Sequence, residues 1–481
     1  MKKSSVFLCL LLLAFILFFE TSIIYAGEKV IGHLNTSKNE VVCQILADQS
    51  STNYLVITRI ENNYYICTEK NRFGPFLEIQ DIKFFENGKS LLYKVKTDKG
   101  FSVYKNDQLI LSTSMLISAL YTVYELDKYL FYVTNEENIL IKEIYTETGY
   151  FGKSFDNVQV MVDQKNKNIY MIINENDKAI LLCNGKILKE AKKFYLQGFS
   201  SDGRLLYVEQ LSDKKENVYI GDKLLGTFSY IKYLKIFDEK SYCICDSNKN
   251  QVFLHGYNFK YGPFKSVTQV YFDGNNVYHV SENKLYKANE FIRSFQKGVN
   301  VFLLKNIKDK EGKFQLYYLT MQDKYKYNYI INLYSTNQKD PLVTYWIKQK
   351  TLMSVGIGRC WCLTDNTFTF IGNIDANDTE TIFLCSLNLS NPGSIFKIGS
   401  FKFDDEVSIN HVFDNLVEFQ VRDILYICLF DMTKVDQTFL VGSIVFNENG
   451  SPISYLFYQP EDSSIVLAFY NMLANSLLKL C

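Results

Sequence analysis

Short apolar stretches of about four to eight residues fill the chain from residue 40 onward, and Gly, Asn and Asp separate them. Examples are YLVITRI (54–60), LLYKV (91–95) and YLFYV (129–133). Many of these stretches are rich in β-branched and aromatic residues, which suit a pleated, half-buried surface. Few amphipathic runs reach helical length, so the pattern predicts an all-β protein.

The strand pattern repeats along the chain. Gly74-Pro75-Phe76 recurs as Gly262-Pro263-Phe264, and a strand, a Gly/Asn turn and a second strand follow each copy. We predict that both copies are turns of the repeat. The two prolines lie 263 − 75 = 188 residues apart. Five equal repeats between them would each be about 38 residues long, a period typical of repeat architectures.

Intermediate copies lie near the positions that this period predicts. They are NVQVMVDQKNKNIYMII (157–173), LQGFSSDGRLLYVEQ (196–210), IKYLKIFDEKSYCIC (231–245) and a weaker LYTVYELDKYLFYV (120–133). The second half of a unit contains a hairpin, signalled by Asn184-Gly185 and Gly221-Asp222. About seven such units fit between residues 38 and 295. Because one four-stranded unit cannot bury both of its faces alone, we predict a β-propeller of about seven four-stranded blades. A β-sandwich with coincidental spacing is the alternative.

The C-terminal part, residues 296–481, is rich in strands but shows no clean repeat. It is predicted to form either extra blades of the same ring or a second β-rich domain. Because seven units suffice to close a ring, the division we favour is a propeller at 27–295 and a separate β-rich part at 296–481. Residues 467–480 have leucines near helical spacing, which also permits a short terminal helix.

One repeat resembles a known family. The segment FSSDGRLLYV (199–208) resembles the core motif of TolB-like and WD-repeat-like bacterial propellers, in which the turn corresponding to Asp202-Gly203 joins two strands of a blade. The proline of that motif is missing here, and no Trp-Asp dipeptide occurs. The resemblance implies the fold and says almost nothing about activity.

The N-terminus has the layout of a secretory signal peptide. Lys2 and Lys3 precede an apolar run from Val6 to Phe19, and Ala26 supplies a small residue for cleavage. An uncleaved membrane anchor is the alternative reading. We therefore expect cleavage after Ala26, a mature chain without a membrane span, and a location outside the cytoplasm, whether periplasmic, cell-surface or secreted.

Composition narrows the function classes. The 52 basic residues balance the 52 acidic residues, so no basic field is available to attract nucleic acid. The cysteine pairs Cys243/Cys245 and Cys360/Cys362 have one-residue spacers, unlike structural zinc sites, and are expected to be buried free thiols. No phosphate-binding loop and no serine nucleophile motif is present. We therefore predict no catalytic, cofactor-binding or metal-binding residues.

The function that fits these observations is a binding or scaffold module for a protein or peptide partner, which would dock at the mouth of the propeller. Two alternatives stay open. One is a glycan-cleaving enzyme with a pair of carboxylates on the central axis. The other is a structural component of the cell envelope.

Overall fold

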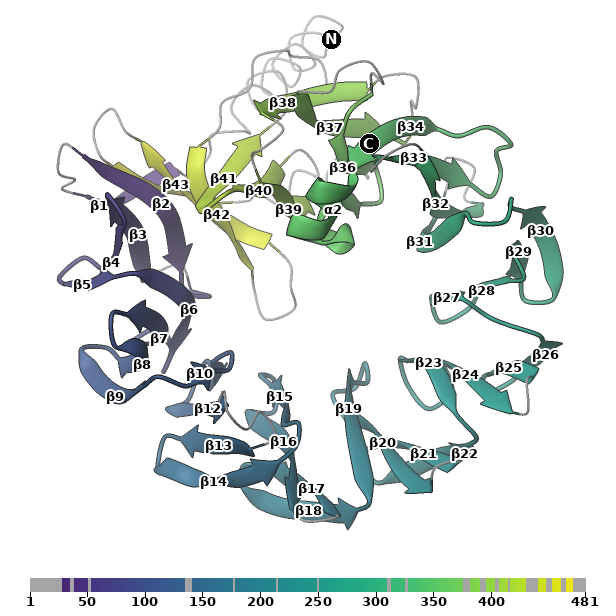
Figure 1. Cartoon of the computed structure of the whole chain (residues 1–481), viewed down its shortest axis with the longest axis horizontal. Helices are drawn as coiled ribbons and strands as arrows, with labels where there is room; N and C mark the ends of the chain where they lie inside the picture. The colour runs from purple at the N-terminus through teal and green to yellow at the C-terminus, as the bar shows by residue number, and fades with distance from the viewer. Residues whose placement is uncertain are drawn as a thin grey trace, which may run out of the picture.

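The computed structural model is a ring of antiparallel sheets around an open centre (Figure 1). It describes residues 28–34, 39–50, 53–134, 141–175, 178–212, 215–248, 251–308, 313–324, 328–374, 381–389, 395–402, 406–413, 416–429, 440–446, 452–459 and 464–469. Within these ranges the strands form ten sheets, which we number in chain order.

Seven sheets lie between Glu40 and Ser294. Sheet 1 has β2 (Glu40–Ala47), β3 (Tyr54–Ile60), β4 (Asn63–Cys67) and β5 (Arg72–Phe76), and sheet 2 has β6 (Glu78–Phe85), β7 (Ser90–Thr97), β8 (Gly100–Lys105) and β9 (Gln108–Thr113). Sheet 3 has β10 (Leu116–Ile117), β11 (Tyr121–Val123), β12 (Lys128–Thr134), β13 (Ile141–Thr146) and β14 (Gly149–Phe155), and sheet 4 has β15 (Gln159–Asp163), β16 (Asn168–Glu175), β17 (Lys178–Cys183) and β18 (Lys186–Ala191). Sheet 5 has β19 (Lys193–Phe199), β20 (Leu205–Ser212), β21 (Lys215–Ile220) and β22 (Lys223–Phe228), sheet 6 has β23 (Ile231–Ile236), β24 (Tyr242–Asn248), β25 (Gln251–His255) and β26 (Lys260–Phe264), and sheet 7 has β27 (Gln269–Phe272), β28 (Val277–Ser281), β29 (Lys284–Lys287) and β30 (Glu290–Ser294).

Three further sheets complete the ring. Sheet 8 has β31 (Asn300–Lys308), β32 (Phe314–Lys324), β33 (Asn328–Ser335) and β34 (Val343–Lys348), and sheet 9 has β35 (Trp361–Leu363), β36 (Thr367–Gly372), β37 (Thr381–Asn388) and β38 (Ile395–Lys402). A short helix, α2 (Gln349–Val355), and a 3-10 turn, η1 (Ile357–Arg359), connect them. Sheet 10 has seven strands, β39 (Val407–Phe413), β40 (Leu416–Val421), β41 (Ile424–Leu429), β42 (Leu440–Phe446), β43 (Pro452–Gln459), β44 (Ser464–Phe469) and β1 (Glu28–His33).

The prediction of an all-β propeller is confirmed, but the predicted number of about seven blades is wrong, because the ring has ten. The seven predicted units correspond to sheets 1 to 7. The C-terminal strands extend the ring, and their period is obscured because β32 has 11 residues and α2 lengthens one connection. Leu467 lies in strand β44, not in a helix, and the predicted signal peptide lies outside the described residues.

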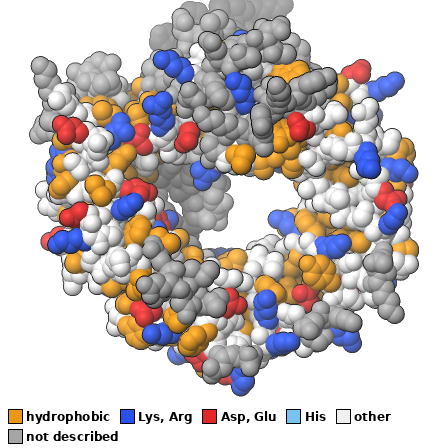
Figure 2. Space-filling model, in the orientation of Figure 1, with side chains coloured by type: hydrophobic (Ala, Val, Ile, Leu, Met, Phe, Trp, Pro, Cys, Tyr) orange, Lys and Arg blue, Asp and Glu red, His pale blue; other side chains and the backbone are white. Residues whose placement is uncertain are grey.

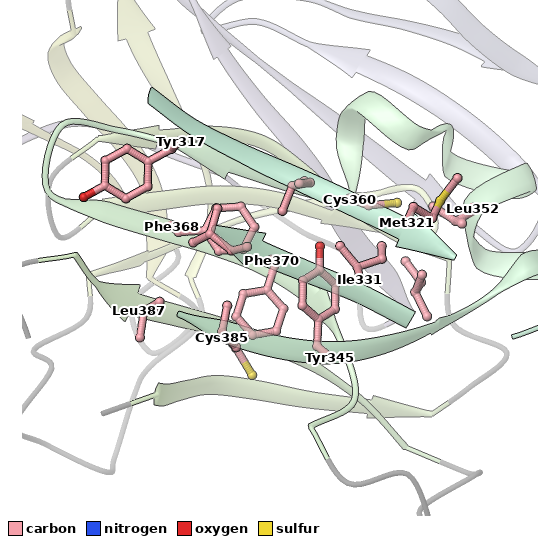
Figure 3. Close-up of a cluster of buried hydrophobic side chains, with 14 of the residues drawn as sticks. Tyr317, Met321, Ile331, Tyr345, Leu352, Cys360, Phe368, Phe370, Cys385 and Leu387 are labelled. Carbon is pink, nitrogen blue, oxygen red and sulfur yellow. The ribbon is translucent and has the colours of Figure 1, made fainter. Parts of the chain in front are cut away.

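The core is divided among the interfaces between neighbouring sheets. Figure 3 shows the cluster between sheets 8 and 9, where Tyr345 of β34 meets Phe370 of β36 with ring centroids 4.2 Å apart. Strand β7 illustrates the pattern that such packing requires, because its first six residues are all buried. Each sheet is apolar on both faces, and stacking around the ring covers both faces of each one.

The two ends of the described chain meet in sheet 10, where β1 pairs with β44 in antiparallel register. Sheet 10 then packs against sheet 1 and closes the ring. The Arg59 guanidinium of β3 lies 2.5 Å from the carboxylate of Asp423, and the Tyr64 hydroxyl donates to the same oxygen at 3.1 Å. The Ser443 hydroxyl donates to the Ile45 carbonyl at 2.5 Å. Among the described residues, no helix is long and apolar enough to cross a membrane.

Candidate partner-binding surface

The turn between the first two strands of a blade explains the sequence period. Asp202 and Gly203 lie in this turn of sheet 5, between β19 and β20, where the Ser200 hydroxyl accepts a hydrogen bond from the Arg204 backbone N–H at 3.0 Å. Carboxylates hold the same turn in sheets 4, 6 and 7. Asp163, Asp238 and Asp273 accept from the backbone N–H groups of Asn166 (3.0 Å), Ser241 (2.9 Å) and Asn276 (2.7 Å), respectively. A short polar side chain that caps its own turn is therefore the recurring element.

The same turns also connect neighbouring sheets. The Ser201 backbone N–H of sheet 5 donates to the Phe237 carbonyl of sheet 6 at 2.7 Å. The Asn306 side-chain amide of sheet 8 donates to the Asp273 carboxylate of sheet 7 at 2.8 Å. One rim of the ring is thereby stabilised by polar contacts that run from sheet to sheet.

The Gly-Pro-Phe segments lie within the outermost strands rather than in the turns between strands. Gly74, Pro75 and Phe76 belong to β5, and Gly262, Pro263 and Phe264 belong to β26. At each site the outer strand carries one more residue than its partner, which is a β-bulge. The bulge explains the glycine, because Gly262 has φ +115° and an added Cβ would lie 2.7 Å from the Val252 carbonyl oxygen. The outer strand also tolerates proline, whose missing N–H costs no ladder bond there.

The first strand of each sheet lies at the inner side of the ring, as Figure 1 shows for β6, β15, β19, β23, β27 and β31. These strands differ in charge around the opening. Strands β19, β23, β27, β31 and β35 contain no Asp or Glu. The lysines on them are Lys193, Lys232, Lys235, Lys305 and Lys308. We call the stretch from β19 to β31 the basic sector of the inner wall.

Figure 2, in the same orientation, shows Lys and Arg side chains along the lower right of the central opening, where Figure 1 places β19, β23 and β27. Lys193, Lys232 and Lys235 are exposed. Lys305 is half-buried and forms an ion pair with Asp365 at 2.7 Å. Four lysine side chains of the basic sector, Lys193, Lys232, Lys235 and the likewise exposed Lys308, therefore form no ion pair with the described part of the chain.

Carboxylates on the inner strands are largely committed to structural contacts. Asp81 of β6 pairs with Lys83 at 3.2 Å and accepts from the Leu120 backbone N–H at 2.8 Å. Glu40 of β2 pairs with Arg72 at 2.9 Å, and Asp163 of β15 caps its turn. Glu78 of β6 is exposed and accepts from the Gln80 side-chain amide at 3.3 Å. The described inner strands thus present one weakly engaged carboxylate, and not the uncommitted pair that glycoside hydrolysis uses.

Bulges recur on the inner strands as well. Six of them carry one extra residue relative to the second strand of the sheet. The extra residues are Cys43, Gln80, Gln197, Lys232, Leu304 and Asn410. A bulge redirects a side chain and interrupts strand pairing, and both Gln197 and Lys232 are exposed.

The cysteines of the described ranges provide no activated thiol, because burial raises the pKa of each one. The nine cysteines in the described ranges are free thiols. Cys243 and Cys245 of β24 and also Cys360 are buried as predicted, whereas Cys362 of β35 is only partly buried. Burial raises the pKa of Cys243 to about 12 and that of Cys245 to about 11, so neither is a thiolate at neutral pH. Within the same part of the chain, no group of three or more His, Cys, Asp or Glu side chains is arranged to hold a metal ion.

Sequence reasoning missed the basic sector because the whole chain is neutral. The strands that carry these lysines, β19, β23 and β31, are separated by tens of residues and come together only because each is the first strand of its blade. Comparing the first strands of successive units would have revealed that units five to seven lack acidic residues there.

No protein-family model and no curated protein matches the chain. Among solved structures, a eukaryotic initiation factor is similar at 11% identity with a TM-score of 0.36, covering 77% of this chain and 90% of that one. The WD40 domain of SCAP from fission yeast is similar at 9% identity with a TM-score of 0.28, covering 92% and 98%. The Swd1 β-propeller domain of Myceliophteria thermophila is similar at 7% identity with a TM-score of 0.24, covering 53% and 97%. We draw no conclusion about family or function from similarities this low, and the relation to TolB-like proteins stays a prediction.

Proposed function

We propose that this propeller is a binding scaffold for a protein or peptide partner that docks at the central opening. The observation that supports the proposal best is the inner wall itself. It exposes lysine side chains that form no ion pair within the described chain, and it also exposes the neutral amide of Gln197, whereas its acidic groups are largely engaged in the fold. The described part of the wall therefore has polar groups available to a partner and presents no pair of uncommitted carboxylates.

The proposal includes no catalysis and no cofactor, and it places the protein outside the cytoplasm after cleavage behind Ala26. Export is supported by the N-terminal sequence alone. Mass spectrometry of the exported protein tests it directly. We expect a mature chain that begins at Gly27, and a chain that retains residue 1 in the cell would contradict export.

Site-specific photo-crosslinking tests the docking proposal. A photoreactive amino acid replaces Gln197, exposed on the inner strand β19, and in a matched variant it replaces Lys186, exposed on the outer strand β18. We expect a discrete protein adduct in the native compartment from position 197 and none from position 186. Equal labelling from both positions, or no adduct at 197, would overturn the proposal. Extraction of the exported fraction distinguishes this scaffold from a structural envelope component. A structural component would stay with the envelope and would not be released as a freely soluble protein.

A further inference from the structure

We infer that the partner presents an acidic segment to the basic sector of the inner wall, with Lys193 of β19 and Lys232 and Lys235 of β23 as its main contacts. The inference rests on the proposed scaffold function and specifies the chemistry of the partner. The carboxylates of the partner would complete ion pairs that the described part of the chain leaves open.

The local charge balance supports this assignment. Two carboxylates that neighbour β23 are already engaged, since Glu216 accepts from the Ile231 backbone N–H at 2.7 Å and Asp246, opposite Ile231, lies 2.7 Å from the His255 ring. Asp156 lies near Lys193 without forming an ion pair with it. The exposed ammonium groups of this region therefore exceed the carboxylates available to them.

Aromatic rings flank the lysines. The Lys193 ammonium lies 5.1 Å from the centroid of the Tyr195 ring, and the Lys235 ammonium lies 5.3 Å from that of Phe237. A ring face attracts a cation but does not neutralise its charge, so the lysines are held in place and stay available to an anion. Tyr230, which precedes β23 and stands two residues before Lys232 in the chain, is 59% exposed and adds an aromatic surface near the start of that strand.

Side-chain charge, not strand addition, is the basis of this recognition. Strands β19 and β23 each pair on one side only, so their other edges are unpaired in the described chain. The bulges at Gln197 and Lys232 interrupt those edges. Because bulged edges pair poorly with another strand, the lysines must supply most of the affinity.

An acidic peptide fits better than nucleic acid. The chain is neutral overall, with 52 basic and 52 acidic residues, and only four lysines of the sector lack an ion pair. Tight binding to a phosphate backbone usually needs more phosphate contacts, on the order of six to ten. We therefore make nucleic acid an outcome of the test.

Fluorescence anisotropy with three labelled probes tests the inference on the full mature chain. The probes are a 12-residue peptide rich in Asp and Glu, its Asn/Gln counterpart, and a 12-nucleotide single-stranded DNA. The proteins are wild type, the double variant K232E/K235E, and the control K186E/K284E, which changes the same net charge at exposed positions on β18 and β29.

We expect the acidic peptide to bind wild type, to weaken roughly tenfold in K232E/K235E, and to change less than about twofold in the control. Circular dichroism and gel filtration establish that the variants are folded. Equal binding of the neutral peptide, equal losses in both variants, or tighter binding of the DNA through the same lysines would overturn the inference. If the acidic peptide fails while a protein still crosslinks to position 197, the inference fails and the scaffold function stands. If position 197 captures nothing, the scaffold function itself fails.

Discussion

A buried carboxyl group in sheet 10 should make the stability of the ring depend on pH. Glu418 of β40 is 5% exposed, and one of its carboxyl oxygens accepts from the Ile444 backbone N–H at 2.7 Å. Burial is the largest influence and raises the pKa of Glu418 from 4.5 to about 7, although the hydrogen bonds from Ile444 and Asn410 oppose the rise. The ring nitrogen of His411 lies 3.9 Å away, and burial lowers the pKa of that histidine.

Because the folded protein holds the Glu418 proton more tightly than the unfolded chain, its stability decreases as the pH rises. Between pH 4.5 and 7 the unfolded chain has released the Glu418 proton and the folded chain retains it, so stability falls as pH rises. The loss is about 1.4 kcal/mol per pH unit, or about 3 kcal/mol over the interval, and it levels off above pH 7. Glu418→Gln keeps an acceptor for the Ile444 N–H and removes the charge.

Urea unfolding of wild type and Glu418→Gln from pH 4 to pH 9 measures this contribution. We expect the two proteins to be similar near pH 4 and the variant to be more stable by about 3 kcal/mol at pH 8. Glu190→Gln, on the exposed outer strand β18, controls for loss of a surface charge. A constant difference across the pH range, or a variant that loses stability at pH 8, would refute the reasoning.

Three further predictions concern closure, packing and backbone shape, and urea midpoints measure each. Asp423→Ala should destabilise the ring by about 1 to 2 kcal/mol, because the half-buried Arg59 guanidinium on β3 loses its acceptor. An unchanged urea midpoint would show that closure of the ring does not depend on this ion pair. Tyr345→Phe should leave the stability unchanged or raise it, since the buried Tyr345 hydroxyl has no hydrogen-bond partner in the described chain. Tyr318→Phe should cost about 1 kcal/mol of stability, because the Tyr318 hydroxyl accepts a hydrogen bond from Arg293 at 2.8 Å. A larger loss in Tyr345→Phe than in Tyr318→Phe would contradict this packing. Gly262→Ala should cost about 1 to 3 kcal/mol of stability, because Gly262 has a positive φ and the new Cβ would lie 2.7 Å from the Val252 carbonyl oxygen. Gly152→Ala should be nearly neutral, because nothing lies within 4 Å of a Cβ there. Equal effects of the two substitutions would contradict the role of the bulge.

The sequence was sufficient to predict the blades between residues 38 and 295, because the same local turn motifs recur in those units. A short polar residue such as Asp163 or Ser200 caps the first turn of a unit, and a hairpin such as Asn184-Gly185 closes its second half. Asn184 and Gly185 both have positive φ, as that hairpin type requires. These signals are local and therefore visible in one sequence.

The number of blades and the inner wall depend on contacts between distant residues. Ring closure joins Arg59 to Asp423 and pairs β1 with β44. No local sequence pattern predicts either contact. The basic sector likewise brings together Lys193 and Lys235 from separate blades. The repeat was not recognised in the C-terminal sheets, because longer strands and the helix α2 change the spacing between units there.

A cryo-electron microscopy map of the protein bound to the partner captured at position 197 tests the central claim most directly. We predict partner density inside the central opening, in contact with the inner strands β19 and β23. Density confined to the outer strands, with the opening empty, would contradict the proposal that the ring is a scaffold that binds its partner at its centre.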